Sequence, residues 1–167
     1  MAARYAEKLH IVPVFAPASS TTAIRSYAVG LKNSHWVTFL INLGVMTSDS
    51  SDVGTVTVIA TDTLGNTTDD QDVAVPFTYR LSGLMGTDED WGDITAATAS
   101  GMTFNATDDG KSIIIDVDPA SIPALHSTSK GVRIAVDGTG LITQAGIAVN
   151  AFVEDRYPQA DHLSATT

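Results

Sequence analysis

The chain has 167 residues and a formal net charge of −10 at pH 7, with nine lysines and arginines, nineteen aspartates and glutamates, and no cysteine. This length fits one domain with a continuous hydrophobic core, and the lack of cysteine excludes disulfide frameworks, thiolate zinc sites and cysteine nucleophiles. The acidic balance argues against a general nucleic-acid binder, because such proteins need a basic surface.

Residues 1–8 are predicted to form a short N-terminal arm that leads into an edge strand, Leu9–Phe15, in which Pro13 is tolerated. A loop is expected over residues 16–22. We expect no secretory signal, because Glu7 stands where such a signal carries positive charge. No apolar run approaches the roughly 18 residues of a membrane helix.

The stretch His35–Leu43 is the most strongly patterned in the chain. Successive side chains of a strand point to opposite faces, so the apolar residues at odd positions from Val37 to Leu43 share one face. The other face carries Trp36, Thr38, Leu40 and Asn42. A strand with one fully apolar face needs a second sheet to cover it, and we therefore expect a central strand of a sandwich.

The other strand-like segments are shorter or more polar and are separated by turn-rich sequence. They cover residues 24–31, 53–61, 73–81, 94–106, 111–117, 131–137 and 144–154. Pro76 places one of them at an edge or a bulge, and Asp118 predicts one helical turn over Pro119–Leu125. About nine strands and no 3.6-residue period indicate an all-β fold, an antiparallel, jelly-roll-like β-sandwich over residues 9–154 with a C-terminal arm over 155–167.

Fourteen of the nineteen acidic residues lie between Asp49 and Asp118, where Arg80 and Lys111 are the only basic residues. This middle region supplies a negative surface, which serves solubility or attracts cations or a basic partner. Its aspartates offer the hard oxygen ligands that calcium uses, without the spacing of an EF-hand loop. The calcium candidates are Asp49, Asp52, Asp69 and Asp70.

Catalytic motifs are not found in the sequence. It has neither a Gly-x-Ser-x-Gly elbow nor a glycine-rich phosphate loop, and its four histidines are dispersed. We therefore expect a protein that is not an enzyme and needs no cofactor. Trp91 lies among acidic residues and is a candidate for stacking on a sugar ring, for filling the end of the sandwich, or for a subunit contact.

Three segments carry a family resemblance. Leu9–Ala18, Lys32–Ile41 and Glu154–Ala160 together resemble small virion proteins of tailed bacteriophages that are encoded near the major capsid gene. The resemblance implies a capsid decoration, or cement, protein: a compact β-sandwich on the outside of the head, often a homotrimer, that clamps neighbouring subunits of the major capsid protein. The cysteine-free, acidic composition suits such a structural protein made in the host cytoplasm, and from the charge and the lack of a long apolar run we expect no nucleic-acid or membrane partner.

Within this resemblance, the two arms are the expected partner contacts, because Arg and Tyr are favoured at interface centres. The expected contact residues are Arg4, Tyr5, Lys8, Arg156, Tyr157 and Pro158. Three alternatives stay open: another minor head or tail protein, a carbohydrate-binding β-sandwich that uses Trp91, and a hydrolase with an unrecognised site.

Overall fold

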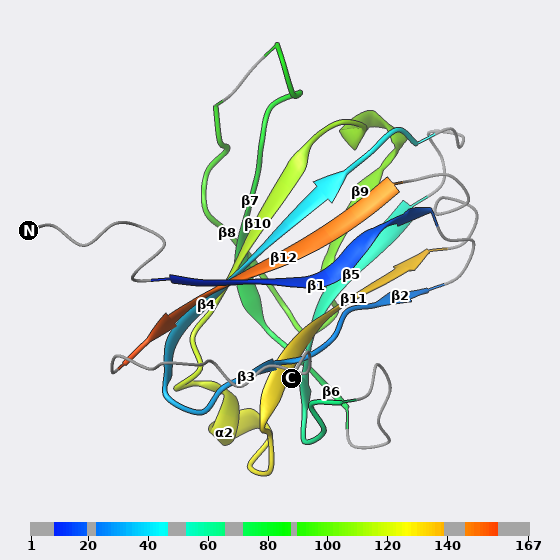
Figure 1. Ribbon diagram of the computed structural model, residues 1–167. Coiled ribbons are helices and arrows are strands. Elements are labelled where there is room, and N and C mark those ends of the chain that lie inside the picture. The colour runs from blue at the N-terminus through cyan, green and yellow to red at the C-terminus, as the bar shows by residue number, and fades with distance from the viewer. Residues whose placement is uncertain are drawn as a thin grey trace, which may run out of the picture.

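Two antiparallel sheets pack face to face in this computed structural model, which describes residues 9–19, 23–46, 53–65, 72–87, 90–138 and 146–156 (Figure 1). Twelve strands lie within these ranges, together with a 3₁₀ turn, η1 (Ala106–Asp108), and a single helical turn, α2 (Ile122–Leu125). The predicted all-β antiparallel sandwich is confirmed.

The first sheet is called the β4 sheet after its long inner strand. Its order is β1 (Leu9–Ser19), β12 (Gly146–Asp155), β4 (Ser34–Leu43), β10 (Ser112–Val117), β7 (Phe77–Leu81) and β8 (Thr95–Ala97). As predicted, the strand that contains Pro13 lies at the edge, and its pairing with β12 shifts register on either side of Phe15. The missing N–H of proline therefore breaks no ladder between inner strands.

The second sheet, the β5 sheet, has β11 (Gly131–Gly138) and β5 (Val53–Thr61) in its middle. Two short strands, β2 (Ile24–Arg25) and β3 (Val29–Gly30), share the other side of β11. Likewise, β6 (Val73–Val75) and β9 (Met102–Asn105) pair with opposite ends of β5. The core lies between the two sheets.

The strand β4 is central, as its pattern predicted, because it pairs with β12 on one side and β10 on the other. Phe39 lies opposite Ala151 and Ile115, and its side chain is fully buried. Val37, Ile41 and Leu43 are buried with it. On β5, Val56 and Val58 are likewise buried. The alternation of apolar residues at every second position therefore identified the core-facing sides of both strands correctly.

The expected number of nine strands was wrong, because three of the predicted strands divide in two. Segment 24–31 gives β2 and β3, segment 73–81 gives β6 and β7, and segment 94–106 gives β8 and β9. At Pro76 the chain leaves the β5 sheet and enters the β4 sheet, and between β8 and β9 it crosses back. An alternating pattern marks the buried side chains but gives no sign of a change of sheet.

Two further boundaries differ from the prediction. The first strand continues to Ser19, through much of the expected loop, because β12 is long enough to pair with it up to Gly146. The helical turn begins at Ile122 rather than Pro119. Asp118 instead accepts a hydrogen bond from the N–H of Ala120 at 2.9 Å, and so caps the turn that precedes α2.

Candidate functional site

The outer face of the β4 sheet, which points away from the core, carries large apolar side chains. The strand register places Thr38 between Phe152 of β12 and Asp116 of β10. One step along the sheet, Leu40 lies between Asn150 and Ile114. On the edge strand β1, Leu9 lies opposite Glu154 and Ile11 lies opposite Phe152.

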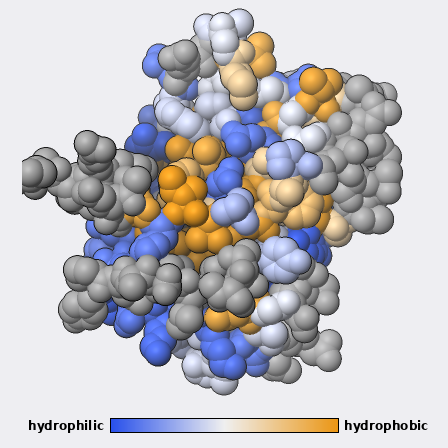
Figure 2. Space-filling model, in the orientation of Figure 1, coloured by the Kyte–Doolittle hydropathy of each residue, from blue (hydrophilic) through white to orange (hydrophobic). Residues whose placement is uncertain are grey.

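These side chains form an apolar surface where a polar one is usual. The solvated face of an antiparallel sheet normally carries polar residues. Here Ile11 is 52% exposed, Trp36 is 39% exposed, and Leu40, Ile114 and Phe152 are half-buried. Figure 2 shows hydrophobic side chains gathered in the middle of the face along which β12, β4 and β10 run. A contiguous exposed apolar patch of this kind is typical of an interaction site.

A polar network fixes the position of Trp36. The carboxylate oxygen Oδ1 of Asp116 accepts hydrogen bonds from Nε1 of Trp36 at 3.3 Å and from Oγ1 of Thr38 at 2.6 Å. All three side chains stand on paired strands, so the indole is held over the sheet before any partner arrives. An aromatic group ordered in advance loses less entropy on binding than a mobile one.

The connection between β7 and β8 brings Trp91 to the same face. Trp91 forms an isolated β-bridge with Ser82. On either side of it, the N–H of Gly92 donates to the carbonyl of Leu81 and the N–H of Gly83 donates to the carbonyl of Asp90, both at 2.9 Å. Trp91 and Trp36 thereby line one pocket of about 390 Å³. The other lining residues are Leu9, Thr38, Leu40, Ile114, Phe152 and Glu154.

The two tryptophans differ in how far the sequence pointed to them. Trp91 was a predicted site residue because of its acidic surroundings, and the structure places it on the apolar face. Trp36 was assigned to the outer side of a strand but not to a site. The signal that could have identified it was the outer side of β4 itself, which carries two large apolar side chains, Trp36 and Leu40, on either side of Thr38.

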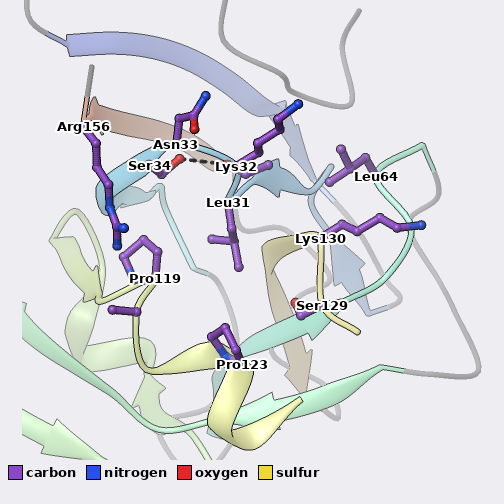
Figure 3. A pocket seen from close by; sticks show the side chains of 12 residues that line it. Leu31, Lys32, Asn33, Ser34, Leu64, Pro119, Pro123, Ser129, Lys130 and Arg156 are labelled. Carbon is purple, nitrogen blue, oxygen red and sulfur yellow. Dashed lines mark hydrogen bonds between the residues drawn. The ribbon is translucent and has the colours of Figure 1, made fainter. Parts of the chain in front are cut away.

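Arg156, the predicted C-terminal contact, lines a second pocket of about 720 Å³ at one end of the sandwich (Figure 3). Lys32, from the turn between β3 and β4, and Lys130, just before β11, line the same pocket. Sequence reasoning missed both lysines, since they lie far from Arg156 along the chain.

The remaining predicted site residues lie outside the residues that the structure describes. They are Arg4, Tyr5, Lys8, Tyr157 and Pro158 of the arms, and the calcium candidates Asp49, Asp52, Asp69 and Asp70. Within the described ranges, no three acidic or histidine side chains gather closely enough to hold a metal ion. No helix there has the length and apolar character needed to cross a bilayer.

No protein-family model matches the chain, and no curated protein matches it. The structure is similar to the crystal structure of the SPBc2 prophage-derived protein YomS, with 12% sequence identity and a TM-score of 0.36. The similarity covers 87% of this chain and 93% of that one.

Proposed function

We propose that the protein is a structural component of a bacteriophage virion, which binds the outside of the capsid and stabilises it by bridging capsid subunits. The observation that carries the proposal is the outer face of the β4 sheet, where Trp36, Trp91 and neighbouring aliphatic side chains are partly exposed. Aromatic residues are enriched at the centres of protein interfaces. The segments that resemble phage decoration proteins support the same role.

The mechanism follows from buried area. Each apolar side chain covered by a capsid subunit adds roughly 25 cal/mol per Å² before the cost of association is subtracted. A contact that spans two subunits raises the free energy needed to separate them. In a homotrimer, the oligomer that the resemblance implies, three such faces bind together, and the high effective concentration multiplies individually weak contacts.

The abundance of the protein in particles tests this role. Quantitative mass spectrometry of purified virions is expected to give a ratio to the major capsid protein near one to one, because a decoration protein covers the whole shell. A few copies per particle would instead place the protein at a vertex, neck or tail, as another minor head or tail component. Its absence from virions would contradict every structural role in the particle.

Carbohydrate binding is a second candidate, and the pocket shared by Trp36 and Trp91 favours it. Two indoles, an apolar floor and the carboxylate of Glu154 line about 390 Å³. Binding pockets of this kind combine apolar walls with a few polar groups that fix the orientation of the ligand. A sugar ring can stack on an indole while the carboxylate accepts hydrogen bonds from its hydroxyls.

For this candidate, replacing Trp91 with alanine is expected to abolish binding on a glycan array, because one wall of the pocket is lost. Tyr27→Ala is the matched control, since Tyr27 is 46% exposed and does not line this pocket. Absence of glycan binding by the unaltered protein would contradict the carbohydrate role and leave the capsid role in place.

A further inference from the structure

The pocket lined by Arg156 concentrates positive charge in an acidic protein. Among the described residues, Arg25, Lys111 and Arg133 each form an ion pair with an aspartate. Arg80 stands exposed on β7. The other three described cations, Lys32, Lys130 and Arg156, all line this one pocket. The described lining contains no carboxylate, although acids outnumber bases in the chain by nineteen to nine.

Backbone hydrogen bonds join the three segments that supply these cations. The carbonyl of Lys130 accepts from the N–H of Leu31 at 2.8 Å, and the carbonyl of Asn33 accepts from the N–H of Arg156 at 2.7 Å. Asn33 has a positive φ of 64°, which asparagine tolerates better than most residues, and this tightens the turn that presents Lys32. The backbone segments that carry the three cations are therefore held together by the fold.

Between the cations the lining is largely apolar. Figure 3 shows the side chain of Leu31 between Arg156 on one side and Lys130 on the other, with Pro119 next to Arg156 and Pro123 below Leu31. Leu64 and Ala120 complete the apolar part of the lining. The volume of about 720 Å³ lies within the roughly 300–1,000 Å³ of ordinary ligand pockets.

The combination selects among anionic ligands. A phosphate site typically presents several backbone N–H groups to the anion. Here the N–H groups of Leu31, Ser34, Lys130 and Arg156 already donate to backbone carbonyls within the fold. An anion would instead be attracted by the charged side chains of Lys32, Lys130 and Arg156, which surround apolar lining residues. That arrangement suits an aliphatic side chain flanked by carboxylates, and a guanidinium can bind a carboxylate through two parallel hydrogen bonds.

We propose that this pocket binds an acidic peptide segment of a partner protein, with an aliphatic residue over Leu31 and carboxylates on Lys32, Lys130 and Arg156. The pocket lies at the end of the sandwich and shares no lining residue with the pocket on the outer face of the β4 sheet. The inference therefore goes beyond the proposed capsid contact and does not depend on it.

Calorimetric titration of the full chain with a blocked peptide, Glu-Leu-Glu-Leu-Glu-Glu, tests the proposal. We expect binding that weakens as salt is raised, and a loss of about tenfold or more in affinity for Arg156→Glu and for Lys130→Glu, because each reverses a positive charge of the pocket lining. Arg80→Glu makes the same charge change elsewhere and should stay within about twofold. Circular dichroism confirms that each variant is folded.

Several outcomes would overturn the proposal: no peptide binding, equal affinity of the Arg156→Glu and Arg80→Glu variants, or displacement of the peptide by inorganic phosphate or oligothymidylate at comparable concentration. The last result would assign the pocket to phosphate groups or to a nucleic acid. A Trp36→Ala variant should bind the peptide normally, so that failure here is distinguishable from failure of the capsid contact.

Discussion

Replacing Trp36 with alanine is expected to weaken binding to purified capsids by about 10- to 100-fold, which corresponds to about 1.4–2.8 kcal/mol. Trp36 lies on the apolar face and lines one pocket with Trp91 and Phe152. Its indole is already oriented by Asp116, so little of its contact energy is lost in ordering the side chain. The affinities of the unaltered protein and of the Trp36→Ala variant are measured by co-sedimentation of each labelled protein with capsids that carry no copy of this protein.

Tyr27→Ala is the matched control for this experiment. Tyr27 is 46% exposed, but it lies between β2 and β3 at the edge of the β5 sheet. Its removal should change capsid affinity by less than about twofold, as is usual for an aromatic side chain outside the interface. If both variants bind capsids as the unaltered protein does, the outer face of the β4 sheet is not the capsid contact.

Replacing Asp72 with alanine is expected to lower the free energy of unfolding by about 3 kcal/mol. Asp72 forms the ion pair of Arg133, whose side chain is fully buried although it points away from the core. The neighbouring core residues of β11, Val132 and Ile134, face the other sheet. The variant would take one carboxylate away from a buried guanidinium, which costs more than the loss of a surface pair.

Two described residues of the connection between β5 and β6, Leu64 and Asp72, lie close to residues of β11. Leu64 approaches Gly131 so closely that a Cβ atom there would lie 2.5 Å from the Cδ2 atom of Leu64 and 2.7 Å from the carbonyl oxygen of Val29. Asp72 follows Leu64 within the same connection between β5 and β6. The ion pair therefore ties Asp72, at the end of this connection, to the sheet.

A double variant separates the charge effect from a general loss of packing. Arg133→Met combined with Asp72→Ala removes both charges and retains an unbranched side chain, so it should recover most of the stability lost in Asp72→Ala. Urea unfolding followed by tryptophan fluorescence gives the free energies. A double variant as unstable as the sum of its two single variants would show that the ion pair is not the source of the effect.

The fold class could be predicted from the sequence because it depends on local periodicity. The alternation from Val37 to Leu43 and from Thr55 to Val58 identifies which side chains are buried, and both patterns are confirmed. The division of segment 73–81 at Pro76 could not be predicted. Both halves bury one side of the strand in the same core, so the pattern continues across the change from one sheet to the other.

The candidate surfaces were only partly predictable for the same reason. Arg156 and Trp91 were identified by residue type and position in the chain, and each lies in a pocket. Their partners were not identified, because they are distant in the sequence. Lys32 and Lys130 come near Arg156 because the ends of β4, β11 and β12 lie together in the fold. Trp36 and Trp91 line one pocket because the bridge at Ser82 holds Trp91 beside the β4 sheet.

By itself the sequence determined the strand faces, the central position of β4 and the acidic balance, which are properties of neighbouring residues or of composition. Only the tertiary structure decided the order of the strands, the apolar outer face with its two tryptophans, and the gathering of three cations in an otherwise acidic protein. Period two fixes the face on which a side chain lies. It does not fix which strand is the neighbour, and that choice depends on long-range packing of the whole chain.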